Sequence, residues 1–427
     1  EGTGEDRIQR KARLEKLEPM EVAQMYANSF QDKYDLLNIL HPSIEPRASG
    51  HVYEQIAMIE KIIANGFAYV ANGSVYFDVV KYSKSNSYGE LSGRVIEELI
   101  AGAGNERRNL EGQDEKRNRE DFALWKKASP EHIMRWPSPW SEGFPGWHIE
   151  CSAMATKYLG AQFDIHGGGM DLLFPHHESE IAQSTICNHV APVRYWVHNN
   201  MITINGKKMG KSYNNVIKLT ELFSGDHPAL EKAYHPMVVR FFILQTHYRS
   251  TLDFGNEALQ AAEKGLKRLW EAYEKLRAMS RESGVGSQES EVDKELDAKV
   301  KNLVAEFDEF MDDDFSTAKV MANMFELVPV INSMKDKTIP VSALRKETFE
   351  LLQKQMKVYI EDILGLKSVT EADNEKLKGV MDLLIDIRKE AKSKKDFATS
   401  DKIRNQLTRL GISLKDEKDG GMSWTVE

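Results

Sequence analysis

The chain has 427 residues, 41% of them hydrophobic, and a formal net charge of −9 at pH 7. This length is enough for about two to four domains with buried cores, and the acidic balance excludes a surface that is basic throughout. No apolar run approaches the roughly 18 residues that predict a membrane span.

Two further features concern the compartment and the start of the chain. The two cysteines, Cys151 and Cys187, are too few for a disulfide framework and indicate a reducing, cytoplasmic location. The first residues, EGTGEDRIQRKARLEK, are polar and lack the apolar stretch of a signal peptide. Because no methionine opens the chain, we expect that it begins inside a longer sequence or was processed.

The first part of the chain is expected to be helical and then to form a hairpin. Helical spacing of apolar residues predicts helices within residues 1–40 and over residues 51–70. The Asn72–Gly73 pair predicts a tight turn, and the alternating residues 73–82 predict a strand after it. Residues 85–145 are polar and are expected to be rich in loops.

The remainder divides into an alternating part and a helical part. Short strands alternate with short helices over residues 146–217, which predicts βα units with a parallel sheet. A long helix is expected over residues 256–279, followed by a flexible polar joint at residues 280–290 and helices to about residue 395. The last residues, 411–427, predict a strand, a Gly-Gly turn and a second strand.

The stretch LLFPHHESEIAQS, residues 172–184, gathers histidines and glutamates near the expected start of a helix. His176 lies four residues before Glu180 and His177 lies three before it, so either pair shares a helix face. Glu178 would point elsewhere, into solvent or onto the helix end. The competing interpretation is a helix start whose carboxylates are favoured only by the helix dipole.

Cys151, in the stretch PGWHIECSAM, precedes these residues and would add a sulfur ligand if the fold brings it close. Cysteine, histidine and glutamate together form a donor set that suits Zn²⁺. Three protein ligands leave one position open, as in a working rather than a structural zinc site. The alternative for Cys151 alone is a small buried apolar side chain.

A second candidate site is the lysine loop, NGKKMGKSYNN, residues 205–215. Lys208 and Lys211 could close on a triphosphate and neutralise its charge as pyrophosphate leaves. The alternative is an exposed basic loop. Upstream, Gly167 and Gly168 would let a nucleotide or substrate approach the backbone closely, although a plain loop explains a glycine run equally well.

These motifs together resemble the cysteinyl-tRNA synthetases, which are class I aminoacyl-tRNA synthetases. The segments that carry the resemblance are GWHIECSAM, FDIHGGGMDLLFPHHESEIAQS, NGKKMGKS and HYRSTLDF, with KKDFATSDKIRNQLTRLGISLKDEKDGGMSW near the end. The resemblance implies the ligation of L-cysteine to tRNA(Cys) at the expense of ATP, by a protein that acts as a monomer.

The resemblance also assigns site residues. It implies zinc ligation by Cys151, His176 and Glu180, and so selects His176 over His177. It places Trp147 beside the cysteine side chain, with His166 and Asp171 in the same pocket. KMGKS, residues 208–212, corresponds to the KMSKS loop that binds ATP, with Gly210 in place of its serine.

The implied fold is α/β, a Rossmann-like catalytic domain with an insertion, followed by a helical bundle and a small C-terminal module. No HIGH-type motif and no fourth cysteine ligand occur in the sequence, so we expect a catalytic domain truncated at its start, with half of the ATP site missing. The regions implied are the rest of the first Rossmann half (1–50), an inserted subdomain (51–145), the second catalytic half (146–217), a stem-contact connector (218–285), a tRNA-binding helical bundle of DALR type (290–370) and an anticodon-binding module (371–427).

Two other functions compete with this one. A related ligase would join activated cysteine to an amine on a small acceptor, but it would not need the long region after residue 255. A non-catalytic tRNA-binding fragment would keep only a basic C-terminal face. The bases of residues 388–409 could form such a face, or they could belong to an ordinary solvated helix.

Overall fold

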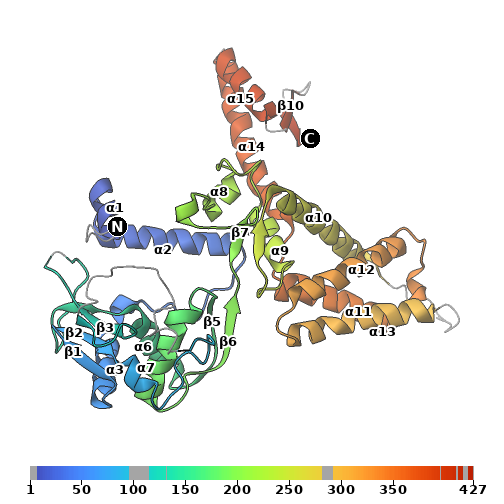
Figure 1. The fold of residues 1–427 in the computed structure, drawn as a ribbon. Helices are drawn as coiled ribbons and strands as arrows, with labels where there is room; N and C mark the ends of the chain where they lie inside the picture. The colour runs from blue at the N-terminus through green and yellow to red at the C-terminus, as the bar shows by residue number, and fades with distance from the viewer. Residues whose placement is uncertain are drawn as a thin grey trace. The chain divides into compact units, whose positions relative to one another are not determined.

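The computed structural model describes residues 7–95, 115–130, 132–280, 292–394, 396–409, 412–416 and 422–426. The chain divides into two compact units (Figure 1), one comprising residues 1–262 with 306–322 and the other residues 263–305 with 323–427. Among the residues described, no helix is both long enough and apolar enough to cross a membrane.

The first unit begins with helices and an antiparallel sheet. Its first elements are α1 (Arg7–Glu15), α2 (Pro19–Leu36), η1 (Ala48–Gly50), α3 (Val52–Ala64), β1 (Ala68–Ala71), β2 (Ser74–Phe77), α4 (Val79–Tyr82), β3 (Phe122–Lys127) and β4 (Gly143–Pro145). The sheet has the strand order β1-β2-β3-β4, with antiparallel pairing throughout.

The predicted hairpin is present, and the predicted loop region contains more structure than expected. Asn72 and Gly73 connect β1 to β2 with positive φ angles of 51° and 84°, a conformation that these residues adopt readily. The helix predicted over residues 51–70 ends at Ala64, and β1 follows it. The prediction that residues 85–145 are mainly loops missed β3 and β4.

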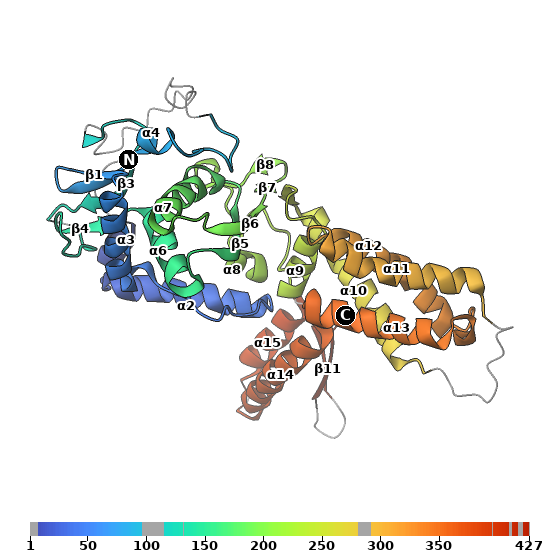
Figure 2. The same cartoon turned by 90° about the horizontal axis from the view of Figure 1, so that it is seen from below.

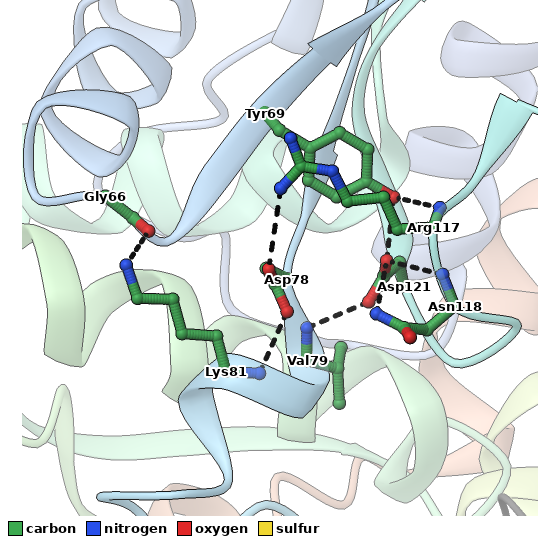
Figure 3. A network of polar contacts seen from close by, with 8 residues as sticks. All are labelled: Gly66, Tyr69, Asp78, Val79, Lys81, Arg117, Asn118 and Asp121. Carbon is green, nitrogen blue, oxygen red and sulfur yellow. Dashed lines mark hydrogen bonds and ion pairs between the residues drawn. The ribbon is translucent and has the colours of Figure 1, made fainter.

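A polar network fixes the approach to β3 (Figure 3). The buried carboxylate of Asp121 accepts hydrogen bonds from Tyr69 Oη at 2.7 Å, from Val79 N at 3.0 Å and from Asn118 N at 3.1 Å. Arg117 lies over the Tyr69 ring at 4.0 Å. Because these partners come from β1, α4 and the segment before β3, one carboxylate holds three separate segments of the chain together.

The first unit continues with alternating helices and strands. These elements are α6 (Trp147–Leu159), β5 (Phe163–Gly169), η3 (Leu173–His177), α7 (Glu178–Asn188), β6 (Val193–Asn199), β7 (Ile202–Ile204), β8 (Lys207–Lys208), η4 (Lys211–Tyr213), α8 (Leu219–Ser224), α9 (Pro236–Leu244), β9 (Leu252–Phe254) and the start of α10 (Asn256–Ala278). β5 pairs with β6 in parallel, as the alternation predicted, and β7 pairs with β9 in parallel and with β8 antiparallel.

One hydrophobic core supports both parts of this unit. Ile59 of α3, Phe77 of β2, Trp125 of β3, Ile149 of α6 and Ala182 of α7 belong to the same buried cluster. Helices α3, α6 and α7 pack against one another, and α6 and α7 lie beside the β5–β6 pair in both views (Figures 1 and 2). The antiparallel sheet therefore stabilises the helices that carry the candidate site.

The second unit is mostly helical and ends in a hairpin. The division between the units falls within two helices, α11 (Lys294–Asp312) and α12 (Thr317–Lys335). The later elements are η6 (Val341–Ala343), α13 (Lys346–Lys357), η7 (Val358–Ile363), α14 (Val369–Ser393), α15 (Phe397–Arg409), β10 (Ile412–Asp416) and β11 (Met422–Val426). β10 and β11 pair antiparallel, which confirms the two strands predicted at the end of the chain. The flexible joint predicted at residues 280–290 lies, apart from Ser280, outside the described residues.

Candidate active site

Cys151 lies on helix α6, whose first residues pack closely against β3. β4 ends at Pro145, and Gly146 is the residue that caps the helix. A Cβ atom on Gly146 would stand 2.0 Å from the carbonyl oxygen of Ala123, so no other residue can bring the helix so close to β3. Cys151 then lies in the second turn of α6 and is partly buried.

Helix α7 and the short η3 segment before it supply the other members of the group. His176 and Glu180 are both buried, with 3% of each residue exposed. One ligand atom from each of Cys151, His176 and Glu180 lies within 4.8 Å of the others. The helical spacing predicted from the sequence thus brings His176 and Glu180 together, and α6 adds the cysteine from a neighbouring helix.

The positions of the individual atoms suit a cation. Glu180 Oε1 lies 3.0 Å from His176 Nε2, and it is buried without a hydrogen bond to any described residue. On its other ring nitrogen, His176 is hydrogen-bonded through Nδ1 to Nδ1 of His148 at 2.8 Å. A histidine held at Nδ1 directs the lone pair of Nε2 into the group, which is the usual support of a metal-ligating imidazole.

The electrostatics of the group also favour a bound cation. Burial, together with the carboxylates of Glu180 and Glu150, raises the pKa of the Cys151 thiol to about 12. Burial lowers the pKa of His148 to about 3, so that its ring stays neutral. A thiolate beside a buried carboxylate is costly unless a cation neutralises both, and sulfur, nitrogen and oxygen donors together suit Zn²⁺. The residues present therefore fit a zinc ion.

His177 belongs to a second group that shares the same glutamate. Ligand atoms of His166, His177 and Glu180 also lie within 4.8 Å of one another. His177 Nδ1 is hydrogen-bonded to His198 Nε2 at 2.8 Å, and burial lowers the pKa of His177 to about 3. The structure therefore places both histidines near Glu180, and the choice of His176 as ligand stays a prediction.

Trp147, His166 and Asp171 surround the group to different degrees. The ring of Trp147 lies 4.3 Å from that of His176, and 60% of Trp147 is exposed, so one aromatic face is open beside the candidate ligands. His166 Nε2 lies 3.8 Å from Glu180 Oε1. Asp171 is exposed just after β5 and is not part of either candidate metal group.

The two predicted glycines have different surroundings in β5. A Cβ on Gly168 would stand 2.6 Å from Cε1 of His177, whereas a Cβ on Gly167 would meet only the carbonyl oxygen of Val197, at 3.7 Å. Gly168 therefore makes room for the His177 ring. This contact gives Gly168 a role in the packing of the site that the sequence did not indicate.

The lysine loop leaves the β7–β8 hairpin. Lys208 is the last residue of β8 and is exposed, and Lys211 begins the η4 turn. Met209 N donates a hydrogen bond to Ile202 O at 3.1 Å, which extends the hairpin into the motif. The lysines follow β7, a strand of a different sheet from the β5–β6 pair that borders the metal group.

Comparison with known proteins places these features in a family. Residues 4–264 match the model of the tRNA synthetases class I (C) catalytic domain, and residues 306–368 match the DALR domain. The chain is 54% identical to the cysteine–tRNA ligase of Phocaeicola vulgatus over 426 residues, which cover 99% of this chain and 83% of that protein. The corresponding ligase of Chlorobaculum tepidum is 44% identical over 99% of this chain and 82% of that protein. The chain belongs to the cysteine–tRNA ligase family.

A solved structure supports the fold of this family member. The chain resembles a structure described as an arginyl-tRNA synthetase of Campylobacter jejuni, with a TM-score of 0.52, 10% identity, and coverage of 82% of this chain and 68% of that one. At this identity the likeness concerns the fold alone. It agrees with the α/β class I catalytic domain and the helical region predicted from the sequence.

In this cysteine–tRNA ligase family member, the environment of Glu178 differs from our prediction. Glu178 was expected to face solvent or the helix end, but only 1% of it is exposed. Its carboxylate accepts hydrogen bonds from the backbone N–H groups of Ser92, at 2.7 Å, and Gly89, at 3.1 Å. Glu178 belongs to neither candidate metal group, as predicted. The prediction that it faces solvent or the helix end is wrong, because residues 88–94 cover this face of α7.

Sequence reasoning also missed His148 and His198. Each is hydrogen-bonded to a candidate ligand, His148 to His176 and His198 to His177. His148 stands three residues before Cys151 in the same quoted segment, so its neighbourhood was a signal. Nothing in the spacing of His198 indicated its partner.

Proposed function

We propose that this protein is a cysteine–tRNA ligase that activates L-cysteine with ATP and transfers it to tRNA(Cys). The observation that carries the proposal is the buried group of Cys151, His176 and Glu180 beside the open ring of Trp147, in a chain 54% identical to a cysteine–tRNA ligase. The DALR domain, residues 306–368, would contribute to tRNA binding. We also propose that the protein acts as a monomer. We place it in the cytoplasm, since two cysteines in a long chain suit a reducing compartment.

The main problem for such an enzyme is to distinguish cysteine from serine. Packing against a side chain of nearly the same shape distinguishes only by about 1–3 kcal/mol. Cys151, His176 and Glu180 would hold Zn²⁺ with one position open, and a bound zinc ion supplies a preference for a thiolate over a hydroxyl. His148 would hold the His176 ring in place, and Trp147 would cover the cysteine side chain.

The chemistry then needs no nucleophile from the protein. The cysteine carboxylate attacks the α-phosphorus of ATP, which forms cysteinyl-adenylate and releases pyrophosphate. The terminal adenosine hydroxyl of the tRNA attacks the acyl carbon next, and AMP leaves. Lys208 and Lys211 would neutralise the charge that develops on the phosphates, with Mg²⁺ bound to ATP. Gly167 would allow close approach of the nucleotide, and His166 and Asp171 would contact the substrate.

The decisive experiment measures cysteine-dependent ATP–pyrophosphate exchange, with serine as the control substrate and zinc quantified in the same sample. It is run on residues 1–427 and on the longest natural form of the protein, because the 427 residues contain no HIGH-type motif. Exchange with cysteine and not with serine, by a protein that contains zinc, is the result expected of a form that carries a HIGH-type motif. Zinc-free protein without exchange in either form would favour a non-catalytic tRNA-binding protein.

The metal ligands are tested by a matched pair of cysteine variants. C151S is expected to lose bound zinc, because serine keeps its proton and is a poor zinc ligand. C187S is the control, since Cys187 packs against the hydrophobic core and belongs to neither candidate metal group. Metal content is measured by atomic spectroscopy and does not depend on activity. Equal zinc in both variants would remove Cys151 from the ligand set.

A further inference from the structure

The backbone of the lysine loop leaves its sheet just where the motif begins. β8 pairs with β7 at Thr203↔Lys208 and Ile204↔Lys207, and Met209 N reaches Ile202 O at 3.1 Å. The next residue, Gly210, is not paired with a strand in the described part of the chain. A backbone that leaves a sheet in this way needs other partners to keep one conformation.

Asn215 supplies these partners through its side chain. Its Oδ1 accepts a hydrogen bond from Gly210 N at 2.9 Å, and its Nδ2 donates one to Lys208 O at 3.1 Å. A carboxamide carries the same acceptor and donor as a peptide group, so Asn215 takes the place of one residue of a neighbouring strand. The two bonds hold the backbone on both sides of Met209.

The local turn explains how Asn215 reaches back to the motif. Tyr213 N donates to Gly210 O at 3.0 Å, which closes the η4 turn over Lys211 and Ser212. Asn214 then adopts a positive φ of 49° and reverses the chain. This reversal brings the side chain of Asn215 within hydrogen-bonding distance of Gly210, five residues earlier.

We propose that Asn215 is a positioning residue for the activation step, because its carboxamide fixes the backbone from which Lys208 and Lys211 extend. The proposal rests on the proposed function, in which these lysines act on the triphosphate. A residue that only orients charges for the departing pyrophosphate affects the rate of activation. It leaves the cysteine pocket unchanged, because that pocket is built from α6, α7 and β5.

The experiment compares three variants by ATP–pyrophosphate exchange, in the form of the protein that supports exchange. N215A removes both hydrogen bonds, and N215D keeps the acceptor for Gly210 N but loses the donor to Lys208 O. N86A is the matched control, since it removes an asparagine side chain whose amide donates to Tyr82 O at 3.2 Å, outside the lysine loop. The rate kcat, the KM values for ATP and cysteine, the zinc content and the melting temperature are measured for each.

N215A and N215D are expected to lower kcat by about ten- to a hundredfold, the effect of a small misplacement of catalytic groups. The KM for cysteine, the zinc content and the melting temperature should stay at wild-type values, and N86A should match the wild type in kcat and in both KM values. An unchanged kcat in N215A, or a loss of kcat accompanied by an equal change in the KM for cysteine, would overturn the proposal. Failure of the wild type itself to exchange would instead contradict the proposed function.

Discussion

Glu178 lies between two candidate ligands in sequence, yet it faces the opposite side of α7. Both of its carboxylate oxygens are used, one by Ser92 N and the other by Gly89 N. The same contact area contains Tyr88, whose Oη lies 3.3 Å from Ser179 Oγ, and Arg94, which lies over the Phe174 ring at 4.4 Å. A single carboxylate therefore fixes the residues 88–94 to the helix that carries Glu180.

Replacing Glu178 by glutamine should destabilise the protein. In either orientation the amide places an NH₂ group opposite a backbone N–H, which leaves a buried donor without an acceptor at a cost of about 1–3 kcal/mol. The free energy of unfolding is measured by urea denaturation. Glu142→Gln is the control, because the Glu142 side chain is 69% exposed and its ion pair with Arg135 is long, at 3.7 Å. If both variants lose equal stability, the two backbone contacts contribute nothing specific.

The residue scale also shows what spacing can and cannot predict. The four-residue separation of His176 and Glu180 predicted a shared helix face, and the structure brings their side chains to 3.0 Å. The orientation of Glu178 was not predictable, because its partners are nearly 90 residues away in the sequence. Local periodicity contains no information about which distant segment covers a helix.

At the scale of one element, strand β5 allows a test of whether Gly168 makes room for the His177 ring. Gly168→Ala would place a methyl group 2.6 Å from the His177 ring, so the ring must move or the strand must shift. Such overpacking costs about 1–3 kcal/mol, and we also expect His177 to lose its hydrogen bond to His198.

Gly167→Ala is the matched control, since its methyl group would meet only Val197 O, at 3.7 Å. The unfolding free energy separates the two variants, and the KM for ATP shows whether Gly167 lies under the nucleotide as predicted. Gly168→Ala with wild-type stability would show that the His177 ring is free to adjust.

Elements with a strong local pattern were predictable, and elements defined by their partners were not. The apolar spacing of residues 52–64 predicted α3, and Asn72–Gly73 predicted the β1–β2 turn. β3 and β4 were missed because they lie in a polar region and are completed by pairing with β2 and with each other. Trp125 of β3 belongs to the same buried cluster as Ile59 of α3 and Ile149 of α6, which are distant from it in sequence.

At the scale of the whole molecule, the structure shows which bases of the C-terminal stretch 388–409 are exposed. Residues 388–409 lie on α14 and α15, apart from the short link between them, and Arg388 is only 2% exposed. Lys394 is paired with Glu390, and Arg404 with Asp401. Both of these bases are exposed, as are Lys389 on α14 and Lys402 on α15.

We expect the double variant K389A/K402A to weaken tRNA binding in a salt-dependent way. If each lysine meets one phosphate, the slope of log affinity against log salt concentration falls by about 1 per lysine. Binding is measured by fluorescence anisotropy with labelled tRNA at several salt concentrations. K61A/K84A removes the same charge from exposed positions of the first unit and is the control; an identical slope in the two double variants would show that the stretch is an ordinary solvated surface.

The candidate metal group has a consequence for the order of folding. Its three members lie within residues 151–180, on α6, η3 and α7, with only β5 between α6 and η3. Other contacts of the same core close far longer loops, such as Asn65 to Ile186, which are 121 residues apart. Because short loops cost less entropy to close, contacts of low sequence separation can assemble the group early. A metal ion that binds it would then act as a nucleus on which the more distant strands condense.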